Sequence, residues 1–295
     1  MTRHPGDAIA SLSGRLALAL PTIFVVIFLL LPMALSLAIS FWERVGLRMK
    51  PAFTLAAYLD FFGGVRLVVL ERSLVAATVA TAIGIALAYP IAYYLSRHVR
   101  REVARGVLFL FSAPFLVNYV IRTFAWTYLL GRTGPINEAL QALGLVDRAV
   151  DWLLFSDFAV HVGLVTSYMP FMVFPLWLSI SGIDRQLTEA SWVLGASPWR
   201  TFLRITLPLS LPGVFAALIF GFVGAFGDSA VPIILGGVGY QLIGNSITST
   251  LDVLNYPLAA AMSSVVILVM LALLALWYVA FDLRSFLGKI VRWRA

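Results

Sequence analysis

Long apolar runs separated by short polar segments dominate this chain of 295 residues. A helix that crosses a membrane needs about 20 consecutive, mostly apolar residues. We therefore expect an all-α membrane protein with six transmembrane helices and no separate soluble domain. The predicted spans are Leu16–Phe41, Ser73–Ser96, Gly106–Leu130, Phe158–Ile180, Leu209–Asp228 and Pro257–Phe281.

Four features between or inside these runs refine the prediction. The first run is longer than the 7–15 residues of a signal-peptide core, which favours a retained span. Pro90 predicts a kink in the second span, because proline lacks a backbone donor. A polar segment, with a turn or re-entrant feature at Phe61–Gly64, is expected before the second span. The spacing of Pro135–Leu145 predicts a helix lying along the surface.

Composition supports the membrane assignment. The chain is 61% hydrophobic and 12% charged, against about 45–50% and 25% in soluble domains, and its mean hydropathy is +0.95. The absence of cysteine excludes disulfides, thiolate zinc sites and a cysteine nucleophile. The net charge of +7 does not indicate nucleic acid, because most basic residues flank the predicted spans.

The distribution of Lys and Arg predicts the orientation. Basic residues concentrate in cytoplasmic loops, and 13 of the 21 lie in the N-terminal tail, the 97–105 loop, the 183–208 loop and the C-terminal tail. Both termini are therefore expected inside, with tails over 1–15 and 283–295 and a membrane domain over 16–282. Arg44, Arg48 and Lys50 oppose this orientation, since it places them outside.

No catalytic constellation is evident. The one Gly-Lys pair, Gly288-Lys289, is followed by Ile290 and so does not complete a phosphate-binding loop. Zinc-protease and serine-hydrolase motifs are absent, and His4, His98 and His161 lie far apart. We expect no catalytic residue, no metal site and no cofactor in this chain, and a function in transport.

The segment Glu189–Pro208, here called the elbow, is a polar interruption between two apolar runs. Gly195 predicts a helix stop, because glycine enters the left-handed conformation without a Cβ penalty. Ser197 and Pro198 read as the N-cap and first residue of a second helix. The pattern predicts a helix, a glycine corner and a second helix.

The elbow resembles the EAA loop of binding-protein-dependent ABC importer permeases. The matching residues are Glu189, Ala190, Gly195, Ile205, Leu207 and Pro208, and the departure is Ser191, which replaces a second alanine. The resemblance implies the type I importer permease fold in the bacterial inner membrane. It also implies that the cytoplasmic loop 183–208 docks on an ATPase.

The same resemblance implies the partners. These are a second, homologous permease in a pseudo-symmetric pair, two copies of an ABC ATPase that bind ATP and Mg, and an extracytoplasmic solute-binding protein. Such a pair needs close helix approach, for which Gly221, Gly224, Ala225 and Gly227 are the candidate residues. A backbone break in the fifth span also needs covering by protein or water.

Three further stretches are similar to the first permease of spermidine/putrescine-type importers: Asn118–Asn137, Gly163–Met172 and Pro232–Gly237. This implies a polyamine as cargo. Members of this branch also carry opines, amino-acid derivatives and other small solutes, which stay open as alternatives. A secondary transporter and a membrane-embedded enzyme are remoter, since neither inverted repeats nor a catalytic constellation is evident.

The candidate residues of a substrate pathway or gate are Asn118, Tyr119, Arg122, Trp126, Tyr168 and Asp228. Members of the family tend to carry glutamate at the position of Asp228. Its carboxylate either meets cargo or a gate, or bonds backbone donors freed by Gly227 and Pro232. Arg122 either gates or reaches the membrane surface. The aromatic residues either attract an alkylammonium by cation–π contact or are ordinary membrane aromatics.

Overall fold

The computed structural model describes residue 19 and residues 21–280, which are mostly helical. The expected tails 1–15 and 283–295 lie outside these residues. The described residues divide into two compact units, those up to Gly64 with Ser249–Leu268, and Val65–Thr248 with 269–280.

The first unit contains a short hairpin that the sequence pattern did not predict. Helices η1 (Val26–Leu30, a π-helix) and α2 (Leu31–Ile39) precede the antiparallel strands β1 (Glu43–Val45) and β2 (Arg48–Lys50), and α3 (Ala56–Phe62) follows. Val45 pairs with Arg48, and Gly46 in the turn has a φ of +64° that favours glycine. The polar segment after the first span is therefore partly ordered as strands and helix.

Five helical stretches are long and apolar enough to cross a membrane among the described residues: Pro21–Ile39, Val65–Arg97, Asp151–Ser181, Pro198–Gly227 and Tyr256–Val279. They contain or overlap five of the six predicted spans. The corresponding helices after α2 are α4 (Val65–Arg97), α8 (Asp157–Ser181), α11 (Leu207–Gly227) and α14 (Tyr256–Ala280). Because α4 begins at Val65, the second long helix starts before the predicted Ser73 and takes in the last part of the expected polar segment.

The remaining predicted span, Gly106–Leu130, is wrong as one continuous helix. It is divided into α5 (Arg101–Ser112), the 3-10 helix η2 (Ala113–Leu116) and α6 (Tyr119–Leu130). Pro114 lies in the first turn of η2, and the Asn118 side chain accepts hydrogen bonds from the backbone N–H groups of Val120 and Ile121. A proline and a helix cap within five residues end one helix and start another. The count of six crossings stays a prediction.

Shorter elements connect these helices. The basic loop expected over 97–105 is reduced to residues 98–100, because α4 ends at Arg97 and α5 starts at Arg101. The helix expected after Pro135 is confirmed as α7 (Pro135–Ala142). The other elements are η3 (Asp151–Leu153), α9 (Arg185–Val193), α10 (Pro198–Thr201), the π-helix η4 (Phe202–Thr206), α12 (Ala230–Leu235) and α13 (Ile243–Asp252).

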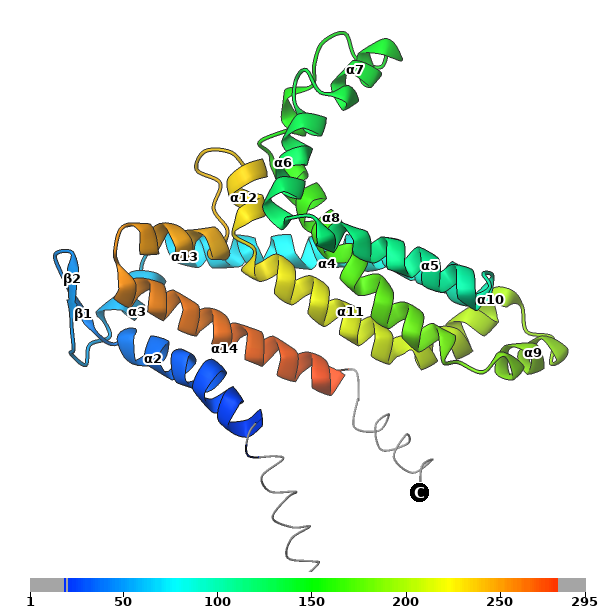
Figure 1. Ribbon diagram of the computed structural model, residues 1–295, viewed down its shortest axis with the longest axis horizontal. Coiled ribbons are helices and arrows are strands. Elements are labelled where there is room, and N and C mark those ends of the chain that lie inside the picture. The colour runs from blue at the N-terminus through cyan, green and yellow to red at the C-terminus, as the bar shows by residue number, and fades with distance from the viewer. Residues whose placement is uncertain (1–18, 20, 281–295) are drawn as a thin grey trace, which may run out of the picture. The chain divides into compact units, whose positions relative to one another are not determined.

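The core of the second unit lies where α4, α8 and α11 run side by side (Figure 1). Small residues such as Ala88, Ala92 and Ala217 are fully buried against Leu176 and Ile180 of α8. A Cβ added at Gly213 of α11 would lie 2.5 Å from the Ser179 Cβ and 2.7 Å from the Pro175 carbonyl oxygen. Small residues therefore set the close approach of α8 and α11.

The expectation that the small residues of α11 face a second permease is wrong for three of them. A Cβ at Gly221 would collide with Met172, and one at Gly224 would collide with the ring of Tyr168. Ala225 is 2% exposed. These residues pack against other parts of this chain, whereas an added Cβ at Gly227 would meet nothing within 4 Å. A one-dimensional pattern of small residues does not reveal which neighbour they approach.

Gly213→Ala provides a test of this packing. We expect it to lower the stability of the purified protein by about 1–3 kcal/mol, the usual effect of overpacking, since the opposing Pro175 oxygen belongs to the backbone. The matched control is Gly106→Ala in α5, where an added Cβ meets nothing within 4 Å. The control should be neutral or more stable by about 1 kcal/mol, the helix preference of alanine over glycine. Thermal unfolding measures both, and equal midpoints would contradict this packing account.

Candidate functional site

The elbow contains the expected glycine corner. Gly195 has a φ of +77° and follows the end of α9. Its N–H donates to the Trp192 carbonyl at 2.9 Å, and the next N–H, of Ala196, donates to the Ser191 carbonyl at 2.9 Å. This is the Schellman arrangement, which satisfies the last carbonyl groups of a helix. Gly195 therefore ends α9 through backbone bonds that require its left-handed conformation.

The second half of the elbow starts as the sequence predicts. The Ser197 side chain caps α10 by accepting from the Arg200 N–H, and Pro198 is the first residue of that helix. After α10 the chain passes through η4 into α11. Ile205 lies in η4, while Leu207 and Pro208 begin α11. The motif residues after the corner thus join the elbow to a membrane-length helix.

Ser191, the residue that departs from the motif, has a specific contact. Its Oγ lies 2.7 Å from Thr201 Oγ1, and both side chains are buried. The Oγ also bonds the Thr188 carbonyl at 2.7 Å. The Ser191–Thr201 bond connects α9 to α10 across the corner, so the serine helps to hold the two helices of the elbow together. The importance of Thr201 was not predicted, because a pair ten residues apart is visible only when folded.

An aromatic contact fixes the elbow on α4. The Phe202 ring lies edge-on to Tyr89 and Tyr93, with centroids 5.8 and 5.9 Å apart, and stacks on Trp199. Aromatic pairs at these separations stabilise beyond their buried area. The angle between the elbow and the long helix is therefore held by side-chain packing as well as by the corner.

The outer face of the elbow is unusually apolar. Val193 and Leu194 are 88% and 87% exposed, and Trp192 and Trp199 are also exposed. Glu189 and Ala190 are exposed too, and Glu189 makes no hydrogen bond or ion pair within residues 21–280. Exposed apolar clusters rimmed by polar groups mark interaction surfaces.

A buried carboxylate lies at the other end of α11. Asp228 follows the last residue of that helix and is only 5% exposed. Its Oδ1 accepts from the Val231 N–H at 2.9 Å, which supplies a partner at the start of α12. This contact matches the alternative in which the acid bonds backbone donors freed at the helix break.

Two tyrosines complete the surroundings of Asp228. The hydroxyl groups of Tyr119 in α6 and Tyr168 in α8 both donate to Asp228 Oδ2, the second at 2.8 Å. The Arg122 guanidinium lies 5.7 Å from the Tyr119 ring centroid and donates to the Pro114 carbonyl at 3.0 Å. The structure thus brings together four of the six predicted pathway residues, and one carboxylate connects three helices.

The other two candidates are placed differently. Asn118 caps α6 through its side-chain oxygen, which is a structural task. Trp126 is half-buried on α6, and no hydrogen bond or ring contact joins it to Asp228 in the described part of the chain. The predicted aromatic wall is therefore reduced to the two tyrosines.

A second polar cluster was missed by the sequence analysis. Asp157 Oδ1 accepts from Arg72 at 2.9 Å and from the Tyr240 hydroxyl at 2.7 Å. The Arg72 guanidinium also lies 4.0 Å from the Tyr240 ring centroid. Burial and the Asp157 carboxylate raise the pKa of Tyr240, so its hydroxyl stays protonated and donates. The three residues come from distant segments, and no local signal connects them.

These features define a multi-spanning membrane protein with an apolar elbow and a buried carboxylate at a helix break. A family model described as "Binding-protein-dependent transport system inner membrane component" matches residues 80–285. The chain belongs to this family of inner-membrane importer permeases. It is a membrane transport subunit and not an enzyme.

Two curated relatives carry the same description, spermidine/putrescine transport system permease protein PotB. The protein from Haemophilus influenzae is 31% identical over 266 residues, covering 90% of this chain and 92% of the relative. The protein from Escherichia coli strain K12 is 39% identical over 173 residues, covering 58% of this chain and 62% of the relative. The second match therefore spans less than two thirds of that relative.

A solved structure shows the same fold. A chain of a bacterial alginate ABC transporter, crystallised with a periplasmic protein bound to an alginate pentasaccharide, superposes with a TM-score of 0.72. The match covers 93% of this chain and 96% of that chain at 19% identity. The likeness confirms the importer permease fold class that the sequence predicted.

Removal of the two tyrosine hydroxyls tests the Asp228 cluster. We expect Tyr119→Phe/Tyr168→Phe to lower stability by about 1–3 kcal/mol, the cost of leaving a buried group without its partners. Tyr128→Phe is the matched control, because Tyr128 is exposed on the same helix as Tyr119. Thermal unfolding of the purified protein compares them, and an undiminished midpoint in the double variant would show that these bonds do not hold the helices together.

Proposed function

We propose that this chain is one of two permease subunits of an ABC importer for a polyamine. In this proposal the elbow docks on a cytoplasmic ATPase, and an extracytoplasmic binding protein delivers the cargo. The second permease is similar but not identical to this chain. ATP and Mg are bound by the ATPase subunits.

The observation that carries the cargo proposal is the 31% identity to a spermidine/putrescine permease over 90% of this chain. The Asp228 cluster supports it in chemical terms. A carboxylate with tyrosine hydroxyls and ring faces provides charge and cation–π attraction for an alkylammonium group. A neutral or anionic solute would gain less from these groups.

The elbow supports the coupling proposal. Its exposed apolar residues offer area to a partner, since burying apolar surface drives association. The corner, the Ser191–Thr201 bond and the Phe202 contacts hold that surface at a fixed angle to α4 and α11. A rigid connection of this kind transmits a movement of the ATPase to the membrane helices. A flexible loop would absorb the same movement.

Uptake by the reconstituted importer tests the function directly. Proteoliposomes containing this chain, its partner permease and its ATPase would be supplied with cargo-loaded binding protein and ATP. We expect radiolabelled spermidine or putrescine to accumulate. Accumulation of an opine or amino-acid derivative with no polyamine uptake would reject the cargo and keep the importer. No ATP-dependent uptake of any of these solutes by an intact complex would reject the proposal.

Variants of Asp228 test its part in transport. Asp228→Asn should reduce polyamine uptake by about tenfold, the effect of losing about 1.4 kcal/mol of favourable interaction. Asp228→Glu should retain more uptake, because it keeps the charge. The readout is the initial uptake rate per assembled complex. Basal ATP hydrolysis serves as the control for assembly. Wild-type uptake by the asparagine variant would assign Asp228 a purely structural task.

Gly195 tests the coupling role through the backbone alone, because an added Cβ there meets nothing within 4 Å. A β-branched residue in the left-handed region costs about 1–3 kcal/mol, whereas asparagine tolerates that region. Gly195→Val should therefore abolish most cargo-stimulated ATP hydrolysis, and Gly195→Asn should keep much of it. Both variants should still insert in the membrane. Equal stimulation in the two variants would contradict a rigid elbow.

A further inference from the structure

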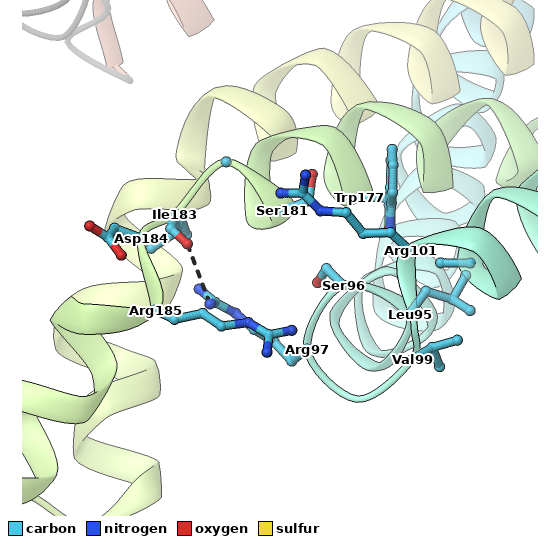
Figure 2. A pocket seen from close by; sticks show the side chains of 12 residues that line it. Leu95, Ser96, Arg97, Val99, Arg101, Trp177, Ser181, Ile183, Asp184 and Arg185 are labelled. Atoms are coloured by element: carbon cyan, nitrogen blue, oxygen red, sulfur yellow. Dashed lines mark hydrogen bonds between the residues drawn. The ribbon is translucent and has the colours of Figure 1, made fainter.

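A cavity of about 470 Å³ lies where α4 and α8 end and where α5 and α9 begin (Figure 2). Three arginines line it, Arg97 from the end of α4, Arg101 from the start of α5 and Arg185 from the start of α9. Apolar side chains, including Leu95 and Val99, line it as well. The cavity therefore combines a strong positive charge with an apolar wall.

Several donors at this cavity have no acceptor. The Nε and Nη2 atoms of Arg97 are buried without a hydrogen-bond partner in the part of the chain described, and so is Nε1 of Trp177. The remaining Arg97 bond, from Nη1 to the Ile183 carbonyl, is long at 3.4 Å. Buried donors, above all charged ones, are costly when unpaired. An acceptor-rich group bound beside Arg97 would give its two unpartnered donors an acceptor, and Trp177 offers a further donor on the lining of the same cavity.

Within the described residues one acid lines the cavity, Asp184, and Glu189 lies with Arg97 and Arg185 around a neighbouring pocket. Among the described residues, no ion pair is formed by Arg97, Arg101 or Arg185. The nearby Asp184 accepts from the Gln186 N–H at 3.0 Å and caps α9. Figure 2 shows its carboxylate turned away from the guanidinium groups of Arg97 and Arg185, which lie close to each other. Like charges repel in this position, and a bound anion would relieve the repulsion.

We propose that this cavity binds a phosphate group. Guanidinium groups match phosphate oxygens in geometry and charge, and they offer several donors at once. The indole N–H of Trp177 adds a further donor. The phosphate comes either from the headgroup of an anionic phospholipid or from solution. A phosphate between Arg97 and Arg185 would connect the end of α4 to the first helix of the elbow.

The position of the cavity favours the lipid source. Both α4 and α8 are long enough to span a membrane, so their ends lie near the membrane–water boundary. Basic pockets between helices at that depth bind anionic headgroups. The apolar wall can contact the glycerol and upper acyl parts of such a lipid, whereas free phosphate has no apolar part to place against it.

Native mass spectrometry of the full importer complex tests the site. The complex would be delipidated in detergent and titrated with phosphatidylglycerol, with phosphatidylcholine as a neutral comparison. We expect saturable retention of phosphatidylglycerol and none of the neutral lipid. Arg97→Gln/Arg185→Gln should weaken retention about tenfold, through loss of two charge-assisted contacts. Trp177→Phe should weaken it less, since it removes one neutral donor.

Arg105→Gln is the matched control, because Arg105 is an exposed arginine of α5 that does not line the cavity. It should leave retention unchanged. If the double variant fails to assemble, Arg185→Gln alone serves, since Arg185 is exposed. Equal retention by the wild type and the cavity variants, or an equal loss in the Arg105 variant, would overturn the proposal.

Inorganic phosphate separates the two sources. Displacement of phosphatidylglycerol by millimolar phosphate, with tight phosphate binding, would identify a free oxyanion as the ligand. Retention of the lipid against phosphate would identify the headgroup. An acidic side chain of the ATPase found paired with Arg97 or Arg185 in a structure of the assembled importer would overturn the phosphate site altogether.

Discussion

The carboxylate of Asp228 lies where α11 stops among packed apolar helices, and the arrangement of three helices depends on it. An unpaired backbone group in a membrane interior costs several kcal/mol, on the order of the values for transfer to hydrocarbon. Asp228 avoids this cost at the start of α12, because its Oδ1 accepts a hydrogen bond from the Val231 N–H. Its Oδ2 accepts from the two tyrosine hydroxyls. A residue that ends one helix thereby also connects α6 and α8. In such a position a structural task and contact with a passing cation are compatible.

The elbow also contains helix ends whose backbone groups need hydrogen-bond partners, but its outer face is exposed and not buried. There the free backbone groups at the end of α9 are satisfied by the bonds around Gly195, and those at the start of α10 by Ser197. Local bonds replace the tertiary partners that Asp228 needs, so the elbow keeps its shape while its side chains stay exposed. The exposed apolar residues are then available to another protein. The two helix breaks of this permease differ in burial, and we propose that they differ accordingly in function.

Local signals were sufficient to predict the elbow, the helix after Pro135 and most of the long helices. They depend on one residue and its neighbours, as with the left-handed glycine and the N-cap serine. The break at Pro114 was missed because the surrounding run is as apolar as a true span. Three other features depend on residues distant in the chain. They are the packing of Gly221 and Gly224 against α8, the Ser191–Thr201 bond and the Arg72–Asp157–Tyr240 cluster. Their partners are defined only by the packed helices.

The chain has no cysteine, which permits a direct test of the central claim that the elbow docks on the ATPase. A single cysteine at Leu194→Cys lies on the exposed face of the elbow, and one at Leu143→Cys, after α7, is also exposed and serves as comparison. In assembled importer, a bifunctional reagent pairing this thiol with nearby amines should link the Leu194→Cys chain to the ATPase and leave the Leu143→Cys chain unlinked. Two results together would contradict this docking. The Leu194→Cys chain would not link to the ATPase, and a membrane-impermeant thiol reagent would label Leu194→Cys from outside intact cells.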